Sequence, residues 1–254
     1  MIKIKSAVEI DKIRKSCEIV AETLKLLKRH IQPGVTTIEL DKIAYDFIIK
    51  KGAIPAFLGY RGYPATICVA INEIVVHGIP DNGKLKEGDI IGVDMGVKFN
   101  GYYGDAAITV GVGEISKKAK EIMDITERAL YKGIKKCFEG NHLSDISHAI
   151  QTNAEENGFS VVRRFVGHGI GTELHEEPSI LNYGPPNMGP VLKNGMVFAI
   201  EPMVNQGTHE VEVLDDKWTV VTKDRKLSAH FEHTVAITEN GPLILTQIEI
   251  LKNK

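Results

Sequence analysis

The sequence predicts a mixed α/β (α+β) fold built from two similar halves, and three observations support this prediction. The 254 residues have a composition usual for a globular chain, with 43% hydrophobic and 25% charged residues. Two helical segments followed by strand-like segments occur twice along the chain. Short sequences of the first half also return in the second half, which is the mark of an internal repeat.

Composition and charge exclude several classes of protein. Lys plus Arg (31) nearly balance Asp plus Glu (33), which argues against a nucleic-acid-binding protein. No apolar run approaches the ~18 residues of a membrane span, and the charged N-terminus is unlike a signal peptide, so we expect a cytoplasmic protein. The few cysteines are far apart and form no CxxC motif, which favours free thiols over disulfides or a Cys-ligated zinc site: Cys17, Cys68 and Cys137.

Two helices are predicted at the start of the first half. Ser6 and Glu9 form a capping-box pair. Thr36 and Glu39 offer a second capping box, and that helix is predicted to run to Gly52. In the first helix, apolar residues recur at the spacing of one helical stripe, at Ile10, Ile13, Cys17, Val20, Leu24 and Leu27.

Strands are predicted after these helices. Thr66–Val76 is rich in Ile and Val. Asp89–Lys98 and Tyr102–Val110 are two further β-rich segments, joined by a region that contains Asn100-Gly101. This dipeptide favours a type I′ hairpin turn, which needs positive φ at both positions.

The pattern then restarts in the second half. Ser116–Phe138 and Ser144–Asn157 are predicted helices. Three predicted strands follow at Phe159–Val166, Val191–Val204 and Ala229–Thr238, with Gly195 and Pro202 as punctuation. We therefore expect one domain over residues 1–254, with halves of about 1–113 and 114–254.

The two halves share short sequences. His77-Gly78-Ile79 returns as His168-Gly169-Ile170, Leu85-Lys86-Glu87-Gly88 returns as Leu192-Lys193-Asn194-Gly195, and Val93-Asp94 returns as Ile200-Glu201. We interpret these echoes as an internal duplication, although chance similarity would explain any single one. A pseudo-twofold between the halves would bring each histidine and carboxylate towards a shared axis. The repeat thus predicts a site built from both halves.

Asp94 and Asp105 are expected on one face of the hairpin. A two-residue turn pairs Asp105 with Gly96 and Asp94 with Ala107, so the two aspartates become diagonal neighbours unless a bulge shifts the register. Both lie among apolar residues, where two like charges need a neutralising cation. The alternative is that both face solvent.

The second half adds further candidate ligands. Glu201 and Glu232 lie in apolar strands, and His168 and His175 enclose a Gly-rich turn. Each alone is explained as an ordinary structural residue. Together with the aspartates they suit two divalent cations, of the Mn²⁺, Fe²⁺ or Co²⁺ type rather than Zn²⁺. Two such ions favour hydrolysis, because they activate water and polarise a carbonyl.

These residues, in this order, resemble a type I methionine aminopeptidase of the bacterial kind. The resemblance implies a duplicated pita-bread fold of the creatinase/aminopeptidase type, and removal of an initiator methionine that precedes a small second residue. It covers nearly the whole chain and rests on AINEIVVHGIP (70–80), GDIIGVDMGVKFNGYYGDAAITVGVG (88–113), GHGIGTELHEEP (167–178), NGMVFAIEPMVN (194–205) and WTVVTKDRKLSAHFEHTVAIT (218–238).

The resemblance implies a role for each candidate residue. A water or hydroxide that bridges the metals would attack the first peptide bond, with Glu201 as general base. His175 would bind the substrate carbonyl, and His77 would contact the scissile amide nitrogen. One metal would be held by Asp94, Asp105 and Glu232, and the other by Asp105, His168, Glu201 and Glu232.

The resemblance also implies two further sites. Tyr60, Tyr63, Cys68 and Trp218 would line the methionine pocket, and Asn72, Ile74 and Ser228 match positions that can hold Na⁺ or K⁺. This sequence departs from relatives at Phe57, where some have Cys, at Leu174, where some have Phe, and at His230, where Gln is common. The first two changes predict a reshaped pocket wall. His230 would be a hydrogen-bond partner of the site or an adventitious ligand.

Two alternatives stay open from the sequence. One is a proline-directed peptidase of the same fold, which usually carries an extra N-terminal domain. The other is a non-catalytic binding protein on this fold. We expect a monomer with no membrane or specific nucleic-acid partner. Transient ribosome contact through Lys3–Lys28 and Lys217–Lys226 is a further hypothesis beside the simpler one of a solvated charged face.

Overall fold

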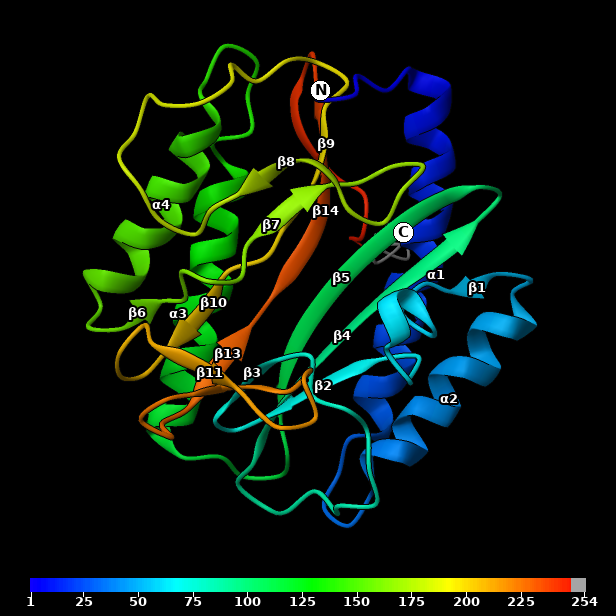
Figure 1. Ribbon diagram of the computed structural model, residues 1–254, viewed down its shortest axis with the longest axis vertical. Coiled ribbons are helices and arrows are strands. Elements are labelled where there is room, and N and C mark those ends of the chain that lie inside the picture. Colours follow the sequence, from blue (N-terminus) through cyan, green and yellow to red (C-terminus); the bar gives the residue numbers. More distant parts are fainter. Residues whose placement is uncertain (248–254) are drawn as a thin grey trace, which may run out of the picture.

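The computed structural model describes residues 1–247 of the chain. Two helix pairs flank a group of curved strands, with α1 and α2 on one side and α3 and α4 on the other (Figure 1). The predicted mixed α/β fold is confirmed, and in each half the helix pair precedes most of the strands. No helix within the described residues is long and apolar enough to cross a membrane.

The helix starts follow the predicted capping signals. The helices are α1 (Ala7–His30), α2 (Thr37–Lys50), α3 (Lys117–Ile134) and α4 (Leu143–Glu155). Both capping boxes are present, at Ser6 and at Thr36. α3 ends before the predicted limit at Phe138. The chain there tightens into i→i+3 hydrogen bonds, such as Lys136 N to Gly133 O at 2.8 Å.

A nine-stranded antiparallel sheet joins the two halves, because β5 of the first half pairs with β14 of the second. Its main path runs β1-β4-β5-β14-β9-β7-β8, while β2 pairs with β4 and β15 with β14. Its strands are β1 (Ile54–Pro55), β2 (Cys68–Ile71), β4 (Ile90–Phe99), β5 (Tyr102–Gly111), β7 (Gly167–Gly169), β8 (Glu176–Ile180), β9 (Val197–Ile200), β14 (Glu232–Thr238) and β15 (Gly241–Ile244).

Two three-stranded sheets lie beside it, in the orders β13-β10-β6 and β11-β12-β3. A short 3₁₀ helix at Tyr60–Gly62 precedes β2. The strands are β3 (Ile74–Val76), β6 (Ser160–Val161), β10 (Met203–Asn205), β11 (Val211–Val213), β12 (Val220–Thr222) and β13 (Ser228–His230).

The predicted hairpin register is confirmed. Phe99 faces Tyr102, Gly96 faces Asp105 and Asp94 faces Ala107. The turn between β4 and β5 has the positive φ values expected of a type I′ turn, 49° at Asn100 and 85° at Gly101. No bulge interrupts this strand pair.

Several long predicted strands are wrong in extent, because each breaks where the chain leaves one sheet for another. Thr66–Val76 becomes β2 and β3, separated at Asn72, whose φ is 52°. Val191–Val204 becomes β9 and β10, separated at Glu201-Pro202. Ala229–Thr238 becomes β13 and β14, separated at Phe231.

The predicted strand Phe159–Val166 shrinks to β6. Its partner is β10, and the last hydrogen bond of the pair runs from Val162 N to Met203 O at 2.9 Å. Pro202 comes next on the partner strand and has no N–H to donate. The following residues of the chain are therefore left without a partner strand, and they bend towards solvent.

The two halves repeat one local structure. Lys84 forms a bridge with Thr36, and Val191, which lies 107 residues later, forms the same bridge with His142. Thr36 and His142 are the N-cap residues of α2 and α4. The glycine turn that follows each bridge leads into β4 in one half and β9 in the other, which supports our interpretation of the echoes as a duplication.

Candidate metal centre

One pocket contains side chains from both halves of the chain, as the internal repeat predicts. Its polar residues include carboxylates, imidazoles and one guanidinium. They are His77, Asp94 and Asp105, with Arg61, from the first half, and His168, His175, Glu201 and Glu232 from the second.

The sheet aligns the carboxylates. Asp94 faces Ala107 across the β4–β5 pair, and Ala107 faces Glu232 across the β5–β14 pair. Opposed residues project to the same face of a sheet, and Asp105 lies two residues from Ala107 on that face. Glu201 directly follows β9, the other neighbour of β14. The carboxylates therefore converge from four strands.

Two threonine hydroxyls hold β5 against the second half on either side of this cluster. Thr234 Oγ1 donates to Asp105 O at 2.7 Å and accepts from Asp105 N at 3.1 Å. Thr109 Oγ1 donates to His230 O at 2.6 Å and accepts from His230 N at 3.0 Å. These bonds join β5 to β14 and to β13, on either side of the short β5–β14 ladder that pairs Ala107 with Glu232 and Ala106 with His233.

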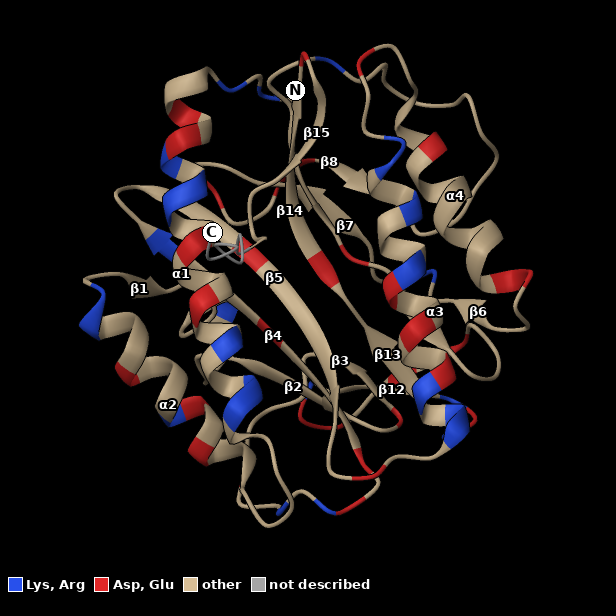
Figure 2. Cartoon of the chain, turned by 180° about the vertical axis from the view of Figure 1, so that it is seen from behind, with Lys and Arg blue, Asp and Glu red and all other residues tan. Residues whose placement is uncertain are grey.

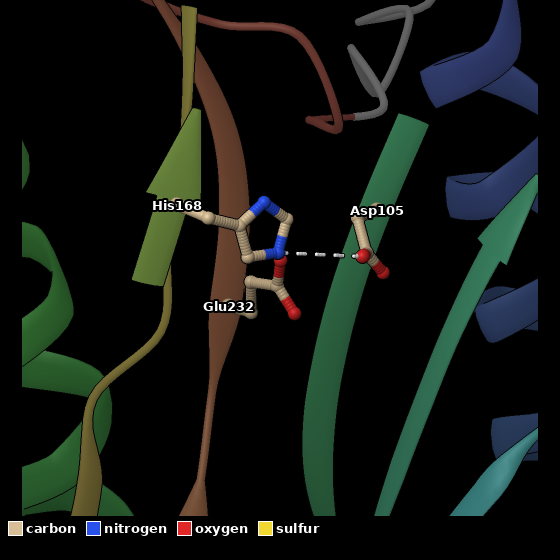
Figure 3. A group of neighbouring side chains, drawn as sticks. All are labelled: Asp105, His168 and Glu232. Atoms are coloured by element: carbon tan, nitrogen blue, oxygen red, sulfur yellow. Dashed lines mark ion pairs between the residues drawn. The ribbon is translucent and has the colours of Figure 1, made fainter. Parts of the chain in front are cut away.

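His168 presents its free nitrogen to the carboxylates (Figure 3). Its Nδ1 donates to Gly169 O at 2.9 Å, which leaves the lone pair on Nε2. Nε2 lies 3.5 Å from Glu201 Oε1 and 4.0 Å from Asp105 Oδ2. Burial lowers the pKa of His168 to about 4, so the ring is neutral at physiological pH, as a metal ligand must be.

The cluster fits divalent cations. Asp105, His168 and Glu232 place one ligand atom each within 4.8 Å of one another. Among the described residues, three carboxylate oxygens are buried with no hydrogen-bond partner: Asp94 Oδ1, Asp105 Oδ1 and Glu232 Oε1. Such atoms are costly unless a ligand satisfies them.

The electrostatics agree with this fit. Burial raises the pKa of Asp94 to about 7. Burial, and then the charges of the neighbouring carboxylates, raise the pKa values of Asp105, Glu201 and Glu232 well above the ordinary range. No Lys or Arg of the described chain forms an ion pair with them. Cations held between the carboxylates would let all four ionise.

Two more histidines reach the pocket above the cluster. The Nδ1 of His175 lies 2.8 Å from the Tyr60 hydroxyl, and its ring centroid lies 4.2 Å from that of His168. The ring of His77 meets Trp218 edge-on at 6.4 Å. Burial lowers the pKa of His77 to about 4 and is the main cause that lowers the pKa of His175 to about 3. Both rings are therefore neutral hydrogen-bond donors near pH 7.

An apolar wall closes the pocket. The buried hydroxyl of Tyr63 lies 2.9 Å from Gly78 O, and its ring packs edge-on against Trp218 at 5.1 Å. Cys68 is buried and faces Asp94 across the β2–β4 pair. Phe57 and Leu174 also line the pocket and approach each other over Gly96. The two residues expected to reshape the pocket thus belong to one wall.

The remaining predicted residues lie outside the pocket. Ser228 N donates to Asn72 O at 2.8 Å, and Ile74 lies in β3 two residues further on. The buried Nε2 of His230 has no hydrogen-bond partner within residues 1–247 and lies 3.9 Å from Glu201 Oε2. The sequence did not lead us to Arg61, which also lines the pocket. Its position between Tyr60 and Tyr63, two predicted pocket residues, would have indicated it.

Comparisons with known proteins agree with this arrangement. Residues 11–239 match metallopeptidase family M24. The chain is 55% identical to the methionine aminopeptidase of Clostridium perfringens, over 98% of this chain and all of that one.

Solved structures give the same picture. The methionine aminopeptidase of Rickettsia prowazekii superposes with a TM-score of 0.96 at 44% identity, covering 97% of this chain and all of that one. A prolidase from Pyrococcus furiosus reaches a TM-score of 0.79 at 27% identity, and the match covers 97% of this chain but only 66% of that one.

Proposed function

Since this chain belongs to metallopeptidase family M24, we infer that the acidic pocket is its active site. The protein is an aminopeptidase that removes N-terminal methionine from peptides and nascent proteins with a small second residue. The carboxylate cluster, with its unpartnered oxygens beside an apolar pocket, is the observation that carries this inference.

We propose the following division of ligands. Asp94, Asp105 and Glu232 hold one divalent cation, and Asp105, His168, Glu201 and Glu232 hold the other. Two such cations supply an activated water for attack on the first peptide carbonyl and polarise that carbonyl. Donors that are mostly oxygen, with one imidazole, favour Mn²⁺, Fe²⁺ or Co²⁺ over Zn²⁺.

The chain's own residues handle binding and protons. Glu201 accepts the proton of the attacking water. The neutral ring of His175 donates a hydrogen bond to the substrate carbonyl as negative charge develops on its oxygen. The ring of His77 contacts the scissile amide nitrogen and assists departure of the new amine. Removal of His175 should therefore lower kcat about 10²- to 10³-fold.

The apolar wall accounts for the methionine side chain. Tyr60, Tyr63, Cys68 and Trp218 form an aromatic, sulfur-tolerant surface of the kind that suits a thioether. A bulky second residue of the substrate would crowd the side of the pocket next to the metals. We further propose that Asn72, Ile74 and Ser228 hold Na⁺ or K⁺.

We propose that the enzyme acts in the cytoplasm as a monomer. Transient ribosome contact would suit trimming of nascent chains. Lys and Arg alternate with Asp and Glu along α1 and α3, so these helices present mixed rather than basic faces (Figure 2). Failure to co-sediment with ribosomes at low salt would remove that contact from the proposal.

A peptide assay on chelator-stripped protein tests the activity. Met-Ala-Ser, Met-Lys-Ser and Gly-Pro-Ala are offered with Mn²⁺, Fe²⁺, Co²⁺ or Zn²⁺ added back. We expect metal-restored release of Met from the first peptide only, lost in Asp105→Asn but kept in the matched control Asp46→Asn, whose carboxylate is exposed.

The other outcomes separate the alternatives. Cleavage of the Gly-Pro bond would favour the proline-directed reading. Absence of turnover with every metal would favour a non-catalytic binding protein on this fold.

A further inference from the structure

A buried ion pair connects the loop that carries His175 to the start of the chain. Lys5 Nζ lies 2.7 Å from Glu176 Oε2, and the two side chains are only 5% and 3% exposed. Glu176 directly follows His175 and begins β8. Lys5 belongs to the segment that precedes α1. In the view of Figure 1, this segment runs across the top of the molecule.

The carboxylate of Glu176 also closes the loop on itself. Its Oε1 accepts hydrogen bonds from Thr172 N at 3.0 Å and from Glu173 N at 3.3 Å. Burial opposes ionisation of Glu176, but the hydrogen bond and charge of Lys5 outweigh it and hold its pKa below the usual range. The ionised side chain thus fixes the turn that ends at His175.

Lys5 is itself bound by the backbone of the turn that leads into β9. Its N donates to Gly195 O at 2.8 Å, in the turn that leads into β9 and Glu201. A Cβ at Gly195 would lie 2.6 Å from Lys5 O, and a Cβ at Gly171 would lie 2.7 Å from Lys5 Cε. Lys5 therefore contacts the turn before β9 through its backbone and the His175 loop through its side chain.

We propose that Lys5 and Glu176 are positioning residues that orient His175 towards the scissile carbonyl. The inference rests on the role of His175 in the proposed function. A buried ion pair is a weak source of stability, because desolvation offsets the attraction between its charges. Its value here lies in geometry, since a shift of about 1 Å in a group that contacts the reacting atoms costs about 10²-fold in rate.

Two matched substitutions test the proposal. Lys3 Nζ also lies near Glu176, 3.3 Å from Oε1, but its side chain is 54% exposed. Lys5→Met should lower kcat for Met-Ala-Ser about 10- to 100-fold, with KM within about threefold and bound metal unchanged. Lys3→Met should leave kcat near the wild-type value. Equal kcat values for the two variants would overturn the proposal.

A double-mutant cycle shows whether the pair acts through His175. If it does, Lys5→Met has no further effect on kcat in a His175→Ala background, because the group that it orients is gone. The same fold-loss in both backgrounds would overturn the proposal, since the pair would then act on stability or on another part of the site.

Two controls keep the test decisive. If Lys5→Met is not recovered folded, the pair Lys5→Met/Glu176→Gln, which leaves no unpaired buried charge, is measured against the same criteria. Wild-type turnover of Met-Ala-Ser tests the proposed function separately. An inactive wild type would remove both proposals, whereas an active wild type with an unaffected Lys5→Met would remove this one alone.

Discussion

Removal of the metals should make the stability of this protein fall with pH, and Asp94 allows the effect to be calculated. Its pKa is raised from 3.8 to about 7 in the folded chain without metal. A group whose pKa is raised on folding contributes stability at low pH, and this contribution is lost as pH rises through the folded value. At about 1.4 kcal/mol per pKa unit, the loss between about pH 5 and pH 8 amounts to about 3 kcal/mol.

The substitution Asp94→Asn removes this contribution. The buried histidines act with the opposite sign, because burial lowers their pKa values, for example those of His77 and His168 to about 4. They are present in both proteins, so a comparison of wild type with the variant cancels them. The free energy of unfolding of the metal-free variant, relative to that of the metal-free wild type, should therefore rise by about 3 kcal/mol between about pH 5 and pH 8.

Urea unfolding of the chelated proteins measures the difference. With an m-value of about 3 kcal/mol per M for a chain of this size, the wild-type midpoint should fall relative to that of the variant by about 1 M. Saturating Mn²⁺ should reverse the order, because the metal binds only the folded wild type with its full ligand set. A midpoint difference that stays constant with pH would refute the reasoning, since Asp94 would then have an ordinary pKa.

Three further substitutions test the packing. Gly96→Ala places a Cβ 2.9 Å from Phe57 Cε1, so KM for Met-Ala-Ser should rise about tenfold in the peptide assay while metal content stays the same. Gly104→Ala places a Cβ 2.6 Å from the backbone N of Cys17 in α1, so calorimetry should show Tm lower by about 5 to 10 °C. Thr36→Ala removes a helix cap and should lower Tm by about 2 to 4 °C with kcat unchanged.

Each of these has a result that contradicts it. An unchanged KM in Gly96→Ala would mean that the Phe57 side chain moves aside without narrowing the pocket. An unchanged Tm in Gly104→Ala would mean that α1 moves away at little cost. A loss of kcat in Thr36→Ala would mean that the cap of α2 affects the active site, for example through Asp41 of α2, whose Oδ1 accepts from Thr66 N and Ile67 N just before Cys68.

Features set by neighbours in sequence were predictable. The capping boxes of α1 and α2 depend on contacts between residues three apart, and both form as predicted. The β4–β5 register depends on Asn100-Gly101, whose positive φ values are a local property. The placement of Asp94 and Asp105 on one face follows from that register. The placement of two of the four carboxylates was therefore predictable from the sequence alone.

The other half depends on contacts between distant residues. Val191–Val204 and Ala229–Thr238 are each predicted as one strand, with Pro202 as punctuation in the first, because an apolar pattern does not show where a strand changes sheets. Only packing brings Glu201 beside Glu232 and leaves buried oxygens without partners. The Lys5–Glu176 pair spans 171 residues, and no local pattern marks it. Short-range signals thus predict the helices and strands. The electrostatics of the site arise only when the folded chain excludes water from its carboxylates and histidines.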